Sequence, residues 1–384
     1  MGDRSTKRAS GFSLLEMTIA MALGTVVLGA AVQLYSQGVA ATWTVTQRAE
    51  LQQDFRAASN MMTRDLSLAG VGLGQGVAIQ LPTSATLPLY GCVQTTGAPC
   101  YLGTANATGA SYPTQGTTPY LYGLLPGYNA GPTINGLQTD VVTVVYTDSS
   151  FYLDCYTAAT ASATSVTFTA IVPTPPATTS ANCTSPTGNA GAQAVNDSVV
   201  GLTAGDLVLF TFGAAQVVAE VNGSVSATSA TFNSGDALKM NQASADPKSL
   251  ASTATGTTGY ATRILVITYY IDNTVSPPRL MRQVSGHTPT PIVDGVTYMK
   301  FTYDLFNNAT TSPAVACSNP GATSDGCAGA STGLLPNQIT KINIAHMAMN
   351  STLKGAKGGY QGLDLETSVS ARDLTYSNNY PIAP

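Results

Sequence analysis

The feature that most restricts the fold of this chain is a run of 31 residues without a charged side chain, between Glu16 and Arg48. Residues 12–35 are mostly apolar, and Glu16 is the only charged residue among them. As a helix, residues 12–35 are about 36 Å long, which is enough to cross a hydrocarbon core of about 30 Å. The N-terminal segment is therefore predicted to be a membrane-spanning helix.

The segment before this run is basic. It contains Arg4, Lys7 and Arg8 and only one acidic residue, Asp3. Basic flanks of this kind keep the N-terminus in the cytoplasm and place the bulk of the chain outside. A cleaved signal peptide has an apolar region of about 7 to 15 residues, so this run is too long. A plain signal anchor fits the length. A signal anchor does not explain why Glu16 lies in the apolar run. An ionisable group inside a membrane segment is energetically costly and therefore indicates a function.

The helix is predicted to continue beyond the membrane. Its apolar residues recur at steps of three and four, as expected for one face of a helix: Leu51, Phe55, Ala58, Met62, Leu66 and Ala69. Gly70 and Gly72 follow, and glycine after the last periodic residue is a common C-terminal signal. One helix over residues 12–69, about 87 Å long, is the expectation.

The rest of the chain is predicted to form strands. Residues 78–139 are rich in Pro, Gly, Thr and Tyr and are typical of a long loop-rich crossover, and 173–180 and 229–259 are also predicted to be loops. Segments with β-branched and aromatic residues bounded by turn formers predict strands at 140–147, 165–172, 206–212, 215–221, 263–271, 278–284, 297–306, 338–349 and 364–374. One long helix followed by a mostly antiparallel sheet is an α+β fold.

The segment Gly11-Phe12-Ser13-Leu14-Leu15-Glu16 resembles the class III signal of type IV prepilins and type II secretion pseudopilins. The resemblance implies cleavage after Gly11 by a membrane prepilin peptidase and N-methylation of the new first residue, Phe12. Glu16 then becomes the fifth residue of the mature chain. Inside a filament core its buried carboxylate needs a partner, and the amino group of Phe12 in an adjacent subunit supplies one and sets the axial register.

Further segments resemble PilW-type minor pilins, in the same order along the chain. They are Arg64-Asp65-Leu66-Ser67-Leu68-Ala69-Gly70, Gly205-Asp206-Leu207-Val208-Leu209-Phe210, Tyr269-Tyr270-Ile271, Pro278-Arg279-Leu280-Met281-Arg282, Val293-Asp294-Gly295-Val296 and Phe301-Thr302-Tyr303. Residues 75–200 and 305–335 show little that matches and are interpreted as inserts. The resemblance implies a pilin-like division into a leader (1–11), a membrane and filament-core half-helix (12–40), an amphipathic half-helix (41–70) and an exported β-rich domain (71–384).

The function that this resemblance implies is that of a minor pilin, which acts in pilus assembly and not in catalysis. The expected partners are the prepilin peptidase, the major pilin and other minor pilins, the inner-membrane assembly platform and the membrane itself. The precursor is expected in the bacterial inner membrane and the mature subunit in the pilus at the cell surface, where it serves motility and adhesion. The alternatives are a J-type minor pseudopilin of a type II secretion system and a tip adhesin.

Composition argues against other classes of protein. Only 9% of residues are charged and the net charge is −4, so there is no basic surface for nucleic acid. The chain has only two histidines, His287 and His346, which argues against a histidine-rich metal centre and against a histidine-dependent catalytic triad. His287 is predicted to be a solvated loop residue and His346 to lie on a strand face. We expect no catalytic residues, no metal and no cofactor.

The six cysteines fall into three pairs that are local in sequence: Cys92 with Cys100, Cys155 with Cys183, and Cys317 with Cys327. Six cysteines allow 15 pairings. In an exported, loop-rich domain the three local disulfides are the simplest hypothesis. No CxxC spacing occurs, which argues against a zinc site.

Overall fold

The computed structural model describes residues 11, 13–73, 78–82, 89–94, 107–115, 118–151, 153–162, 164–170, 194–213, 215–236, 240–241, 250, 258–306, 314–320, 334–355, 358–372 and 374. The chain divides into two compact units. The helix unit comprises Met1–Gln53 and Ser351–Gln361, and the sheet unit comprises Asp54–Asn350 and Gly362–Pro384.

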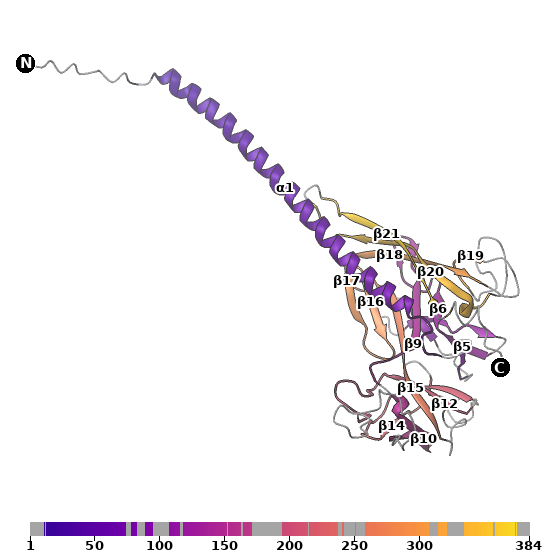
Figure 1. Cartoon of the computed structure of the whole chain (residues 1–384). Helices are drawn as coiled ribbons and strands as arrows, with labels where there is room; N and C mark the ends of the chain where they lie inside the picture. The colour runs from indigo at the N-terminus through magenta and orange to yellow at the C-terminus, as the bar shows by residue number, and fades with distance from the viewer. Residues whose placement is uncertain are drawn as a thin grey trace, which may run out of the picture. The chain divides into compact units, whose positions relative to one another are not determined.

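Helix α1 (Leu14–Ser67) contains 54 residues and is the long element drawn in indigo to purple in Figure 1. Its bounds lie within two residues of those predicted. The helix ends because Gly70 and Gly72 follow it with φ angles of 82° and 74°, a conformation that residues with a Cβ atom avoid. A Cβ atom at Gly72 would also collide with the side chain of Thr147.

The two halves of α1 differ in burial, as the sequence predicts. Large apolar side chains between Leu14 and Val45 are exposed. The positions predicted to form the apolar face of the second half are all buried, each at most 4% exposed: Leu51, Phe55, Ala58, Met62, Leu66 and Ala69. The period of the apolar residues therefore identified the buried face correctly.

The sheet unit is organised around one long strand, β15 (Thr258–Asp272). The N-terminal part of β15 pairs with β12 (Leu207–Phe212) and β10 (Tyr156–Ser162). Its C-terminal part pairs with β9 (Val141–Thr147) and β16 (Arg279–Val284). All four pairings are antiparallel.

Five further strands complete this ten-stranded sheet, whose main path runs β13-β12-β15-β10-β11-β14. They are β6 (Leu124–Gly127), β11 (Ser165–Ala170), β13 (Ala215–Glu220), β14 (Ser229–Thr231) and β17 (Thr290–Asp294). β6 pairs with β9, and β17 pairs with β16.

A second, four-stranded sheet has the order β19-β18-β20-β21. Its strands are β18 (Val296–Leu305), β19 (Ala314–Cys317), β20 (Ile339–Asn350) and β21 (Gly362–Ser370), and all its pairings are antiparallel. One long helix with mostly antiparallel sheets confirms the predicted α+β fold. Each segment predicted to be a strand overlaps an observed strand.

The prediction that residues 78–139 form a loop-rich crossover was wrong. This segment contains β1 (Ala78–Gln80), β2 (Leu89–Gln94), β3 (Ala107–Ser111), β4 (Thr114–Gln115), β5 (Thr118–Tyr122), β6, β7 (Thr133–Ile134) and β8 (Leu137–Gln138). β1, β5 and β4 form a small sheet, while β2 pairs with β3 and β7 with β8. These strands have only two to six residues each, and β6 even contains Pro126, so their sequences gave no clear strand signal. Pairing stabilises them, between neighbours in the sequence for β4 with β5 and β7 with β8, and over a longer separation for β6 with β9. The prediction of a loop over residues 229–259 was also wrong at its start, because β14 occupies Ser229–Thr231.

Aromatic side chains fill a core on the β10, β11 and β12 side of the long sheet. Phe210 stacks on Phe212 with ring centroids 5.8 Å apart and meets Phe232 edge to face at 5.3 Å. Phe168 also stacks on Phe210, with ring centroids 6.4 Å apart. Ala261 of β15 belongs to the same buried cluster.

The two adjacent methionines on α1 provide a direct test of the buried face. Met62 is 0% exposed, whereas Met61 is 43% exposed. We expect Met62→Ala to lower the free energy of unfolding by about 2 to 5 kcal/mol, since it opens a cavity in a packed core. The matched control Met61→Ala should change it by about 0.5 kcal/mol or less. Denaturant titrations of the detergent-solubilised chain, followed by near-ultraviolet circular dichroism, measure both; equal losses would contradict the assigned face.

Candidate processing and assembly site

The residue at the predicted cleavage position is accessible. Gly11 is exposed, and a Cβ atom built on it would have no neighbour within 4 Å. Gly11 also lies before α1, outside the regular hydrogen bonds of the helix. Phe12, the predicted methylation site, lies outside the described residues. An exposed, non-helical backbone at Gly11 is what a peptidase needs to reach the bond that follows it.

Ser13 and Glu16 form a reciprocal cap at the start of α1. The Oγ atom of Ser13 accepts the backbone N–H of Leu15 at 3.3 Å, and Oε2 of Glu16 accepts the backbone N–H of Ser13 at 3.0 Å. The carbonyl of Ser13 accepts the first helical bond, from Met17, at 3.2 Å. This is a variant of the capping box in which Ser13 accepts the N–H of the second helical residue instead of the third, and it satisfies two backbone donors at the helix N-terminus.

The cap gives Glu16 a local role that the resemblance did not imply. A carboxylate in the first turn is also favoured by the positive end of the helix dipole. The signal was present in the sequence, because Ser followed three residues later by Glu before an apolar run is the signature of a capping box.

The surface that follows Glu16 is apolar and uncovered. Among the described residues, α1 is long and apolar enough to cross a membrane; its most apolar window has a mean hydropathy of 1.9 and is not buried within the structure. Such a surface is unstable in water and requires lipid or other apolar helices around it. The motif, the cap and this surface together describe a membrane-anchored precursor.

At the other end of α1, Asp65 joins the helix to three strands. Oδ2 of Asp65 accepts the hydroxyl of Tyr269 on β15 at 2.6 Å and Nε of Arg282 on β16 at 2.8 Å. Oδ1 accepts the hydroxyl of Tyr146 on β9 at 3.4 Å. Burial and the adjacent Asp65 carboxylate raise the pKa of Tyr146 to about 12 and also raise that of Tyr269, so both hydroxyls stay protonated and donate.

The chain that leaves α1 continues this attachment through its backbone. Gly70 donates its N–H to the carbonyl of Val145, and Thr147 donates to the carbonyl of Val71, both at 2.9 Å. Asp65, Tyr269 and Arg282 stand in three separate segments of the sequence. The structure brings these three segments together in one buried cluster.

His287 is not the solvated loop residue that the sequence predicted. Its Nε2 atom lies 2.8 Å from Oδ1 of Asp206, and Nη1 of Arg263 lies 3.6 Å from Oδ2 of the same carboxylate. Arg263 also forms an ion pair with Asp148 and donates to the carbonyl of Gly201 at 3.0 Å. His287 and Asp206 are far apart in sequence, so no local pattern could have predicted the contact.

These contacts move the pKa values of His287 and Asp206 in opposite directions. The hydrogen bond to Asp206 raises the pKa of His287 above 6.5, against the opposing effect of burial. Burial alone would raise the pKa of Asp206, but the hydrogen bonds from His287 and Thr203 and the charge of Arg263 outweigh it and lower that pKa below 3.8. Both shifts favour the charged pair.

Two of the predicted disulfide cysteines can be placed. Cys155 and Cys317 are buried, and each takes part in a disulfide bond. Their predicted partners Cys183 and Cys327 lie outside the described residues, as do Cys100 and the side chain of Cys92. The three local pairings therefore stay predictions.

His346 lies on β20, as predicted, and its ring meets Tyr298 edge to face at a centroid distance of 5.2 Å. Within the described part of the chain, no group of three or more His, Cys, Asp or Glu side chains is arranged to hold a metal ion.

Comparison with known families gives a match at the N-terminus of the chain. Residues 6–32 match the prokaryotic N-terminal methylation motif, which covers the cleavage position, the cap and the start of the apolar run. This motif supports a type IV pilin-like or pseudopilin protein. No curated protein and no solved structure shows significant similarity to the chain.

The His287–Asp206 pair predicts a pH dependence of stability. His287 stabilises the fold below its unfolded pKa of 6.5 and loses this contribution as the pH rises through its higher folded pKa. Asp206 contributes above 3.8 and loses its share as the pH falls through its lower folded pKa. We expect His287→Gln to cost about 1 kcal/mol near pH 6, a value discounted for partial exposure, and clearly less near pH 9.

Thermal unfolding of the wild type and His287→Gln across this pH range measures the effect. The control is the same substitution in an Asp206→Asn background, where the pH dependence of the difference should disappear. A cost of His287→Gln that is equal at both pH values would contradict the pairing.

Proposed function

We propose that this protein is a minor pilin of the PilW type, a subunit that takes part in the assembly of a type IV pilus. The observation that carries the proposal is the methylation motif over residues 6–32, at the start of an exposed apolar helix. The clustering of Asp65, Tyr269 and Arg282 supports the PilW assignment, since these residues belong to the segments on which that resemblance rests.

The first step in this function is insertion and processing. Arg4, Lys7 and Arg8 keep the leader in the cytoplasm while α1 spans the inner membrane. The prepilin peptidase then cuts after Gly11, and the new N-terminal residue, Phe12, is methylated. Neither reaction changes the backbone N–H of Ser13, so the cap between Ser13 and Glu16 persists in the mature subunit.

The second step is assembly with the major pilin and other minor pilins at the inner-membrane platform. Removal of the leader exposes an amino group on Phe12, and the carboxylate of Glu16 in a neighbouring subunit pairs with it. Such a pair in an apolar core is stable only when both partners are present, so it selects one axial register. The exposed residues of α1 between Leu14 and Val45 then pack against other helices instead of lipid.

In this scheme the chain has a leader (1–11), a filament-core half-helix (12–40), an amphipathic half-helix (41–70) and an exported domain (71–384). The mature subunit is incorporated into the pilus at the cell surface, where the three local disulfides stabilise the exported domain. Mass spectrometry of peptides from non-reduced protein identifies the cysteine pairing.

Processing is tested by expressing the chain with and without a prepilin peptidase. We expect a mature protein that begins at N-methylated Phe12 only when the peptidase is present, as measured by intact-mass analysis and N-terminal sequencing. A bulky residue at the cleavage position, as in Gly11→Val, should block the cut without preventing membrane insertion. A mature N-terminus that never appears at Phe12 would overturn the proposed function.

The register role of Glu16 is separated from its cap by two variants. Glu16→Ala removes both the cap and the intersubunit pair, and we expect normal insertion and cleavage but at least about tenfold less subunit in purified filaments, as for loss of a buried charge partner. Ser13→Ala removes the side-chain cap alone, at about 1 kcal/mol of helix stability, and should leave incorporation near the wild-type level.

Quantitative immunoblots of sheared pili, normalised to the membrane fraction, measure incorporation in both variants. Equal losses in Glu16→Ala and Ser13→Ala would assign the function of Glu16 to the helix cap and exclude the register mechanism.

A further inference from the structure

A loop of the helix unit is tied to α1 close to the point where the uncharged run ends. The backbone carbonyl of Lys354 accepts two hydrogen bonds, from Nε1 of Trp43 and from Nε2 of Gln47, both at 3.4 Å. Gln47 is buried, whereas the indole of Trp43 stays partly exposed. The contact therefore fixes the loop on the helix while an aromatic surface is left uncovered.

This loop, Ser351–Gln361, connects β20 to β21 and is closed by its own hydrogen bonds. The N–H of Ser351 donates to the carbonyl of Gln361 at 2.8 Å, and that of Gly355 donates to the carbonyl of Gly359 at 2.7 Å. Leu353 and Tyr360 are 55% and 54% exposed. The loop thus presents a large apolar and a large aromatic side chain to the outside.

The charge of the loop is entirely positive. Its sequence contains Lys354 and Lys357 and no acidic residue. The ammonium group of Lys354 lies 5.8 Å from the ring centroid of Tyr360, so a cation and an aromatic ring occupy the same part of the surface. Lysine beside aromatic residues is the composition of protein surfaces at the boundary of a membrane.

The position of Trp43 along α1 matches the outer boundary of a bilayer. From Leu14 to Trp43 the helix rises by about 44 Å, and a bilayer with its headgroups is about 40 to 45 Å thick. Tyr35 is about 32 Å from Leu14, near the outer edge of the hydrocarbon core. When the first turn of α1 lies at the cytoplasmic face, Trp43 and the loop lie at the level of the opposite headgroups.

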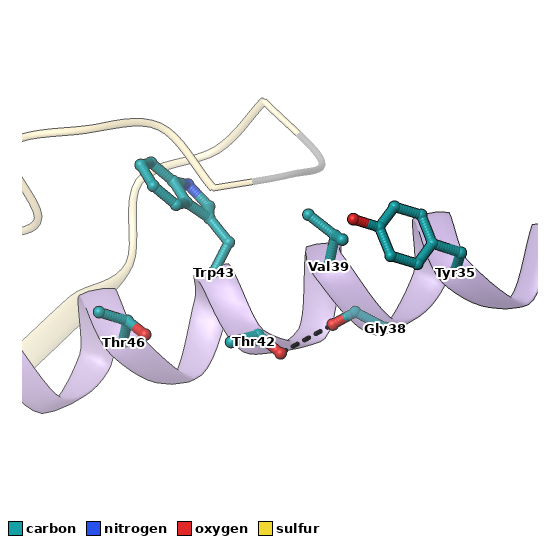
Figure 2. A pocket seen from close by; sticks show the side chains of 6 residues that line it. All are labelled: Tyr35, Gly38, Val39, Thr42, Trp43 and Thr46. Carbon is teal, nitrogen blue, oxygen red and sulfur yellow. Dashed lines mark hydrogen bonds between the residues drawn. The ribbon is translucent and has the colours of Figure 1, made fainter.

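The helix surface at this level is grooved. Figure 2 shows Tyr35, Val39 and Trp43 projecting to one side of α1, around an open groove of about 420 Å³ that Gly38, Thr42 and Thr46 also line. A second groove, of about 610 Å³, lies between helix residues such as Ala40, Ala41 and Thr44 and the loop residues Gly355, Gly359 and Gln361. Both grooves combine small residues with polar groups.

We propose that Trp43 and the Ser351–Gln361 loop form a docking surface for the headgroups of anionic phospholipids in the outer leaflet of the inner membrane. The aromatic rings enter the interfacial layer, and the ammonium group of Lys354 binds lipid phosphates. The loop thereby fixes how deep α1 sits before the subunit leaves the membrane. The inference rests on the membrane insertion that the proposed function requires, and it does not depend on processing.

A second copy of the chain is the less suitable partner for this surface. The uncharged run of α1 between Glu16 and Arg48 contains no carboxylate, so the same run of a second copy at the same depth in the membrane brings none to Lys354. An anionic phospholipid supplies that negative charge at the right depth.

Trp43 is the only tryptophan of the chain, so its fluorescence reports on this surface alone. The full precursor is reconstituted into vesicles of phosphatidylcholine and phosphatidylglycerol that carry a quencher on the headgroup or near the ends of the acyl chains. We expect the headgroup quencher to act at least about twofold more strongly, as for an interfacial aromatic residue. Stronger quenching from the chain ends would overturn the inference.

The lysines are tested by hydrogen exchange of the Ser351–Gln361 loop in the same vesicles. Exchange should be slower by several-fold than in vesicles of phosphatidylcholine alone, and the double variant Lys354→Gln/Lys357→Gln should lose this difference. The control Lys341→Gln, an exposed lysine on β20, should keep it. Exchange that does not depend on the anionic lipid would contradict the proposal.

Two further outcomes are distinguished by the same samples. Loss of the protein on alkaline extraction would show that α1 is not inserted, which refutes the membrane anchor itself and not only the docking surface. Protection of Trp43 and the loop that increases with the protein-to-lipid ratio would assign the surface to a second copy and exclude the lipid.

Discussion

The packing of the sheet unit depends on one buried carboxylate, that of Asp65. Its hydrogen bonds to Tyr146, Tyr269 and Arg282 come from β9, β15 and β16, and removal of one member of such a buried charge pair typically costs about 3 to 5 kcal/mol. Apolar contacts are not directional, whereas these bonds are. Asp65 therefore adds directional bonds to the C-terminal part of α1, where Met62 and Leu66 are also buried.

The elements that could be predicted from the sequence are those whose own residues determine them. The long helix follows from an uncharged run joined to a period of three and four, and its end follows from Gly70 and Gly72. Strands β9, β12 and β15 are rich in β-branched and aromatic residues, which suit a buried sheet whatever lies beside them. The Ser13–Glu16 cap is equally local and could have been predicted.

Interactions between distant parts of the chain could not be predicted in this way. β6 forms because β9 completes its hydrogen bonds, and neither Pro126 nor Gly127 favours a strand by itself. The pKa of His287 is raised only because the fold places Asp206 within hydrogen-bonding distance of its ring. The docking loop could not be predicted either, because the hydrogen bond from Trp43 to the carbonyl of Lys354 joins residues that are 311 positions apart in the sequence.

The length of β15 has a consequence for how the sheet unit forms. Ala261, in its first part, belongs to the aromatic core, while Tyr269, in its last part, binds Asp65. Side chains alternate along a strand, so a slip by one residue turns every one of them to the opposite face. A slip of β15 against its neighbours would therefore destroy the aromatic core and the attachment of the helix together. The aromatic core and the hydrogen bonds of Asp65 therefore depend on the same register of β15.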